Sequence, residues 1–145
     1  MTRNLDIAEA YFVEAKNDYD TVSILIKSKK FSIAVYHAQQ AVEKLLKSCL
    51  AAEGKIGIFK HEIFSFFLNE FKDKIDNLKM AKLEDAVIPL EENWALSRYP
   101  DWSNKPIWIP SQQFTVDNAQ MSEKRMQTVF EILLPFLKKK YKIQV

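Results

Sequence analysis

The chain has 145 residues, 48% of them hydrophobic and 28% charged, with a formal net charge of +2. This length is enough for a single domain, 1–145, with one hydrophobic core, and is too short for two domains of ordinary size. Only two glycines occur, Gly54 and Gly57, which argues against sandwiches and barrels with many tight turns and favours long helices. The small net charge does not by itself predict nucleic-acid binding.

Cellular location is predicted from what the chain lacks. Cys49 is the single cysteine, so no internal disulfide can form, and its apolar helix position predicts a packed side chain rather than a reactive thiol. The first twenty residues carry carboxylates throughout, unlike a signal peptide. No segment approaches the roughly 20 apolar residues of a membrane span. We therefore expect a cytoplasmic protein with no membrane segment.

The first predicted helix runs from Leu5 to Ser28, with Asn4 as its N-cap. Its expected buried face is Ala8, Phe12, Ala15, Tyr19, Val22 and Ile26. A second helix is predicted from Phe31 to Glu53, and Gly54 follows where a left-handed cap is wanted. The two-residue loop between them requires an antiparallel hairpin.

The second helix also carries a polar stripe opposite its apolar face. The side chains of this stripe are Tyr36, Gln40, Glu43 and Lys47, with Gln39 and Lys44 beside them. Amides and charges at helical spacing on one face predict a surface that a ligand or partner recognises.

A third helix is predicted from Lys60 to Phe71, and His61 would lie in its first turn. Apolar side chains occupy most of its circumference, so one packing face cannot cover them all. Either other helices clamp this segment, or part of it meets a second chain. A fourth helix is predicted from Asn77 to Ser97, with a kink at Pro89. Its expected buried face is Met80, Leu83, Val87, Leu90 and Trp94.

The segment Arg98–Phe114 contains three prolines and two tryptophans and has no helical or strand period. We expect an ordered loop in which Trp102, Ile107 and Trp108 pack against the bundle. The last helix should begin after Thr115 as N-cap and end near Lys142. Its expected buried face is Ala119, Met126, Val129, Leu133 and Leu137.

Several familiar sites are excluded because their residues are missing. A phosphate loop needs an upstream glycine and a following Ser or Thr, which Gly54 and Lys55 lack. Two histidines and one cysteine cannot form a closed structural zinc site. Adjacent Glu91 and Glu92 point about 100° apart on a helix, which disfavours shared acid–base chemistry. We predict no metal site and no cofactor.

The segment after the fourth helix is a candidate binding site. Arg98 can hold a phosphate while Tyr99 stacks a base. Alternatively, Arg98 pairs with Asp101 or Glu92, and Tyr99 packs under the loop. His37 is expected to be a structural, partly buried histidine, whereas His61 either caps its helix or faces a cleft.

Four segments in this order resemble HEPN-domain proteins. They are AEAYFVEAKNDYDTVSILI, FSIAVYHAQQAVEKLLKSCLAAEGK, KHEIFSFF and SRYPD. The resemblance covers roughly Ala8 to Asp101 and implies an all-α, up-and-down bundle of about five helices, with the Pro/Trp-rich loop before the last helix. It further implies a homodimer and a nucleotidyltransferase partner in a toxin–antitoxin or defence system.

Many members of this family are ribonucleases with an arginine followed, after four to six residues, by a histidine. None of Arg3, Arg98 and Arg125 has a histidine at that spacing. We therefore predict a non-catalytic module that binds a nucleotide, RNA or a partner protein rather than an enzyme. The predicted binding residues are Gln39, Gln40, Glu43, Lys47, His61, Arg98, Tyr99 and Asp101. The alternatives are a metal-independent ribonuclease using His61 and Arg98, and a purely structural dimerisation or adaptor domain.

Overall fold

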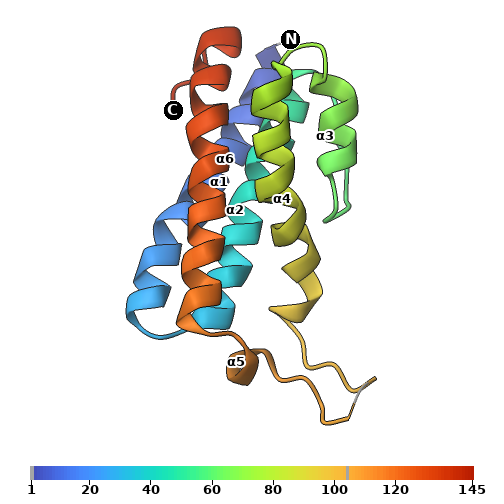
Figure 1. The fold of residues 1–145 in the computed structure, drawn as a ribbon. Helices are drawn as coiled ribbons and strands as arrows, with labels where there is room; N and C mark the ends of the chain where they lie inside the picture. Colours follow the sequence, from blue (N-terminus) through green and yellow to red (C-terminus); the bar gives the residue numbers. More distant parts are fainter. Residues whose placement is uncertain (1, 104) are drawn as a thin grey trace.

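The structure is a computed structural model and describes residues 2–103 and 105–145. Within these ranges the chain forms six helices, α1 (Thr2–Lys27), α2 (Phe31–Ala52), α3 (Phe64–Phe71), α4 (Asn77–Leu96), α5 (Pro110–Gln113) and α6 (Val116–Tyr141). The four long helices lie side by side and alternate in direction (Figure 1). This arrangement confirms the all-α, up-and-down bundle, with the short α5 added to the five predicted helices.

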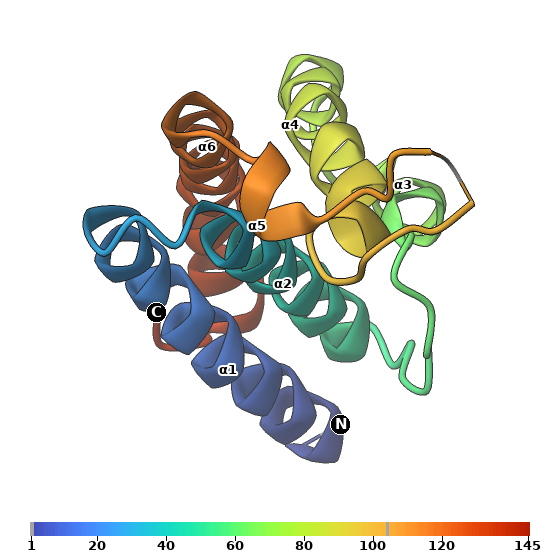
Figure 2. The same cartoon turned by 90° about the horizontal axis from the view of Figure 1, so that it is seen from below.

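Helix α2 is the centre of the bundle, and Figure 2 shows it surrounded by the other helices. It packs against α1, α3, α4, α5 and α6. Its small residues Ala34, Ala38 and Ala41 are fully buried, which allows the close approach predicted for the α1–α2 hairpin. Gly54 has a φ of 80° and its N–H bonds to the Ala51 carbonyl, so the predicted left-handed cap is confirmed.

Helix α1 begins at Thr2, so the prediction that Asn4 is its N-cap is wrong. No proline or glycine precedes Asn4 to stop the helix, and a residue with good capping chemistry does not end a helix by itself. The expected face is otherwise correct. Ala8, Phe12, Ala15 and Val22 are buried, and Tyr19 and Ile26 pack partly buried against them.

Helix α3 begins at Phe64, four residues later than predicted, and leaves His61 in the preceding loop. The cause is Glu91 of α4, whose carboxylate accepts hydrogen bonds from the backbone N–H groups of Ile63 and Phe64. These are donors that a helix start leaves unpaired, so a side chain distant in sequence fixes where α3 begins. Helices α2 and α4 both contact α3, and its Phe64, Phe67 and Phe71 are buried.

Helices α4 and α6 follow their predictions closely. The Asp76 side chain caps α4 by accepting from the Lys79 N–H, at 2.8 Å, and the helix continues across Pro89. Thr115 and Asn118 form a reciprocal capping box at the start of α6. The expected buried residues of α6, namely Ala119, Met126, Val129, Leu133 and Leu137, are all buried.

The segment between α4 and α5 projects from one end of the bundle as an arm (Figure 1). Trp102 is 79% exposed and Ile107 52% exposed, so the prediction that both pack against the bundle is wrong. Trp108 does pack there, donating from Nε1 to the Leu96 carbonyl at 2.9 Å. A short antiparallel bridge between Asp101 and Trp108 joins the two sides of the arm.

None of the described helices has the combination of length and apolar character required to cross a membrane.

Candidate functional site

The polar stripe of α2 converges on one buried carboxylate, that of Glu43. It accepts hydrogen bonds from Gln39 Nε2 at 2.9 Å and Lys47 Nζ at 3.1 Å, and it lies 3.2 Å from His61 Nδ1. Gln40 extends the network by donating to the Gln39 oxygen at 2.8 Å. Gln39 is 1% and Glu43 5% exposed, so these two side chains face inward and support the site rather than forming its surface.

His61 is held by two side-chain contacts although it lies in a loop. Its ring stacks on Trp94 of α4, with centroids 4.1 Å apart and planes 19° apart. Its Nδ1 faces Glu43, and Glu91 caps the helix that follows. Burial raises the pKa of Glu91, and the two backbone hydrogen bonds oppose that rise. Helix α4 therefore holds His61 directly through Trp94 and fixes the start of the helix that follows it through Glu91.

Arg98 does not form the ion pair considered from the sequence. Its guanidinium carbon lies 3.8 Å from the Tyr36 ring centroid and 4.7 Å from that of Trp94. Within the described ranges it makes no ion pair with a carboxylate. A guanidinium over aromatic faces is held by cation–π attraction, which leaves its donors for another acceptor. Tyr99 is 55% exposed and meets Trp94 edge-on.

Asp101 is directed elsewhere. Its Oδ1 accepts from the Ser103 N–H at 2.9 Å and from the Ser103 hydroxyl at 2.6 Å, and these bonds lower the pKa of the carboxyl. Asp101 therefore shapes the base of the arm. The structure connects the other predicted residues, Gln39, Gln40, Glu43, Lys47, His61, Arg98 and Tyr99, through hydrogen bonds and the Trp94 ring.

Two hydrogen-bond donors among the side chains around Trp94 have no acceptor. Among the described residues, Trp94 Nε1 and Arg98 Nε are the buried side-chain nitrogen or oxygen atoms that lack a hydrogen-bond partner. An unmatched buried donor costs about 1 to 3 kcal/mol, and both of these belong to side chains in mutual contact. A bound acceptor, from a ligand or from water, would remove this cost.

An open hollow of about 470 Å³ adjoins these side chains. Its walls are Lys60, His61, Glu62, Ser65, Phe66 and Trp94. His61 and Trp94 thus have one side in the buried network and another facing space that a ligand could enter. We call the set formed by Tyr36, His61, Trp94, Arg98 and Tyr99 the aromatic–arginine cluster.

Trp94 is predicted from the sequence only as a core residue, and its contacts with His61 and Arg98 are not predicted. Trp94 lies in the last turn of α4 and Arg98 two residues beyond the helix end, and their four-residue spacing is the signal that links them. No local pattern indicates that Glu91 caps α3.

A second buried carboxylate, Asp18, joins α1 to α2. His37 Nδ1 lies 2.8 Å from one of its oxygens, and Lys44 Nζ donates to the other at 2.7 Å. Burial raises the pKa of Asp18, but the hydrogen bonds from His37 and Lys44 outweigh burial and leave it lowered. This contact is consistent with the structural role expected for His37. Cys49 is fully buried, as predicted, and burial raises its pKa.

The chain is similar to known proteins in sequence and in fold. Residues 8–140 match the model of the HEPN domain. A Methanocaldococcus jannaschii protein described as "Putative toxin MJ1304" is 32% identical over 146 residues, covering 95% of this chain and 93% of that protein. The crystal structure of TT1696 from Thermus thermophilus has a similar fold, with a TM-score of 0.73 at 19% identity, over 88% of this chain and 96% of the other.

Proposed function

We propose, from the premise that this chain belongs to the HEPN domain family, that it is a non-catalytic, nucleotide-binding module of the toxin–antitoxin type. The relative described as a toxin supports this class because the similarity extends over nearly the whole of both chains. In this proposal the second component is a nucleotidyltransferase, the partner that the family resemblance implies.

The observation that carries the nucleotide proposal is the pair of unmatched donors, Trp94 Nε1 and Arg98 Nε. Both atoms are shielded from solvent in the structure, so in this proposal the Trp94 and Arg98 side chains shift when the nucleotide binds, and its phosphate oxygens and base carbonyls then accept from them. Arginine binds phosphate with particular strength. Exposed Tyr99 offers a ring face on which a base would stack. Lys60, at the edge of the hollow, adds a positive charge.

The remaining residues divide by role. His61, Arg98 and Tyr99 would touch the nucleotide, together with Trp94. Gln39, Gln40, Glu43 and Lys47 would hold His61 in place, because the hydrogen bonds of Glu43 connect all of them. Asp101 would act indirectly by ordering the arm that follows Tyr99.

Calorimetric titration with ATP, GTP, AMP and GMP tests the proposal. Trp94→Phe keeps a ring but removes the unmatched N–H, and we expect affinity to fall about ten-fold. Trp102→Phe is the matched control, since Trp102 is 79% exposed on the arm, and should bind like wild type. Absence of heat and of any thermal shift with millimolar nucleotide would refute nucleotide binding.

A metal-independent ribonuclease is a second candidate, favoured by how His61 is held. A carboxylate facing Nδ1 fixes the orientation of an imidazole for proton transfer, and Glu43 faces His61 in this way. Arg98 contacts the same Trp94 ring and would stabilise phosphorane charge. RNA cleavage lost in both His61→Ala and Arg98→Ala would establish the enzyme, whereas full activity in either variant would exclude this site.

Self-association is a third proposal, and it rests on the exposed aromatic side chains near α3. Phe59 is 88% and Phe66 39% exposed, although the rest of the α3 apolar surface is buried. Light scattering over a dilution series should show a dimer that Phe59→Ser together with Phe66→Ser dissociates. A strict monomer at high concentration would exclude a homodimer.

A further inference from the structure

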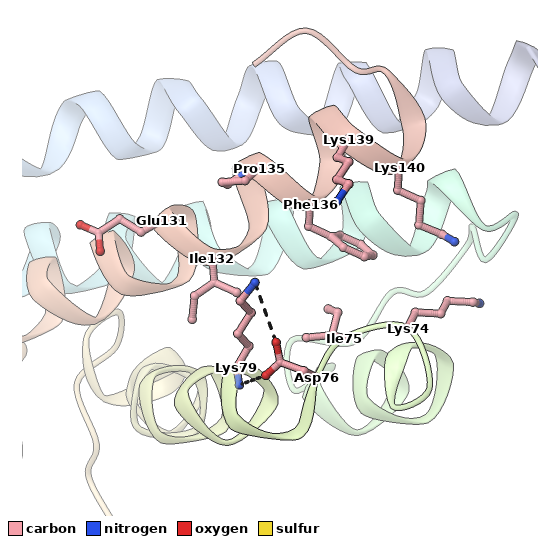
Figure 3. Close-up of a pocket in the computed structure, with 10 residues that line it drawn as sticks. All are labelled: Lys74, Ile75, Asp76, Lys79, Glu131, Ile132, Pro135, Phe136, Lys139 and Lys140. Atoms are coloured by element: carbon pink, nitrogen blue, oxygen red, sulfur yellow. Dashed lines mark hydrogen bonds and ion pairs between the residues drawn. The ribbon is translucent and has the colours of Figure 1, made fainter.

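A cavity lies at the end of the bundle away from the arm, between the turn that joins α3 to α4 and the last turns of α6 (Figure 3). Its volume of about 600 Å³ falls within the range of small-ligand sites. It shares no lining residue with the hollow beside His61. No residue of the proposed nucleotide site lines this cavity.

The floor of this cavity is apolar and fixed. Ile75, Ile132, Pro135 and Phe136 line it. The Phe136 ring packs edge-on against Phe71 at 5.6 Å and against Tyr141 at 5.9 Å, with interplanar angles of 85° and 83°. Because aromatic neighbours on two sides hold Phe136, the floor is already formed before a ligand arrives, which lowers the entropic cost of binding.

Positive charge surrounds this floor at one end. Lys139 and Lys140 extend from the last turns of α6, and Lys74 approaches the same end from the α3–α4 turn (Figure 3). Lys74 already pairs with Glu53 at 3.0 Å and Glu70 at 3.5 Å. Within the described ranges Lys139 and Lys140 form no ion pair. Two adjacent unpaired ammonium groups attract an anion.

The two carboxylates that line the cavity leave Lys139 and Lys140 free to bind an anion. Asp76 is engaged as the cap of α4, and Glu131 lies at the other end of the cavity, nine residues before Lys140 (Figure 3). That separation corresponds to about 13 Å along an α-helix. An elongated anion would therefore place its charged head at Lys139 and Lys140 and keep it away from Glu131.

The lining contains no side-chain hydroxyl, amide or imidazole. Its polar groups are four lysines and two carboxylates, so what it offers a ligand is charge and apolar contact. We propose that this cavity binds an amphipathic monoanion with an aliphatic body, of the medium-chain carboxylate class. The carboxylate pairs with Lys139 and Lys140, and the chain covers Ile132 and Phe136.

Calorimetry with sodium decanoate, below its micelle concentration and at low salt, tests this assignment on the full chain. We expect one binding site per chain. The double variant Lys139→Gln/Lys140→Gln keeps most of each side chain but removes both charges, and its affinity should fall about five-fold. Lys29→Gln/Lys30→Gln removes the same charge from the exposed α1–α2 loop and should leave the affinity unchanged.

Decanol, which has the same chain without the charge, should bind more weakly than decanoate. The assignment is overturned if decanoate does not bind at millimolar concentration, if both double variants lose affinity equally, or if decanol binds as well as the acid. Loss of nucleotide binding in Trp94→Phe leaves the decanoate result unaffected, so the two sites are tested separately.

Discussion

Helix α2 contributes to two clusters with nearly the same chemistry and different surroundings. In one, Asp18 lies against His37 and Lys44. In the other, Glu43 lies against His61 and Lys47. Each is a buried carboxylate with one imidazole and one ammonium group, so the residue types alone do not distinguish a structural cluster from a binding site.

What differs is the set of neighbours. Asp18 joins two helices that pack along their length, and all of its partners lie on the α1–α2 hairpin. Glu43 holds a loop histidine that stacks on Trp94, next to two unmatched donors and an open hollow. Unsatisfied donors beside accessible space set the Glu43 cluster apart, whereas a histidine–carboxylate pair does not, because Asp18 has one as well.

The largest effect on stability should follow from Asp18→Ala. Removing the carboxylate leaves Lys44 and His37 partly buried without their partner, and we expect the free energy of unfolding to fall by about 2 to 3 kcal/mol. Urea denaturation measures this change. Nucleotide affinity, measured by calorimetry on the folded variant, should stay within about two-fold of wild type. A large loss of affinity would show that the two clusters are not independent.

A smaller effect on stability, accompanied by a functional effect, is expected for Glu43→Gln. The amide has nearly the same shape and keeps one acceptor, but it weakens the attraction to Lys47, so we expect a loss of about 1 to 2 kcal/mol in unfolding free energy. His61 is then held less firmly, and nucleotide affinity should fall about three-fold. Unchanged affinity would mean that Glu43, like Asp18, is only structural.

Periodicity predicted most of the fold because burial repeats along each helix. The faces of α1, α4 and α6 were each expected from three- and four-residue spacing and are largely buried as expected. The error at the start of α3 has a different origin. Glu91 bonds to Ile63 and Phe64 from 28 and 27 residues away, and no local pattern contains a contact of that kind.

The site was only partly predictable for the same reason. The stripe of α2 was recognised because its members are helical neighbours, and Gln39 does bond to Glu43 four residues on. That the stripe would turn inward, and that His61 would reach Glu43 from a loop, depends on tertiary packing. For Trp102, aromatic character suggested burial, but the Asp101–Trp108 bridge holds it on an exposed arm.

The smallest effect is a pH dependence of stability to which Asp18 should contribute. Because the pKa of Asp18 is lowered in the folded chain, the stability that its ionised form contributes is present above the ordinary value of 3.8 and is lost as pH falls through the folded pKa. The unfolding free energy of wild type should therefore exceed that of Asp18→Asn by about 1 kcal/mol at pH 6, and the gap should close toward pH 2.5. Urea titrations at both pH values measure this gap. A gap that persists at pH 2.5 would mean that Asp18 stabilises the hairpin by its packing rather than by its charge.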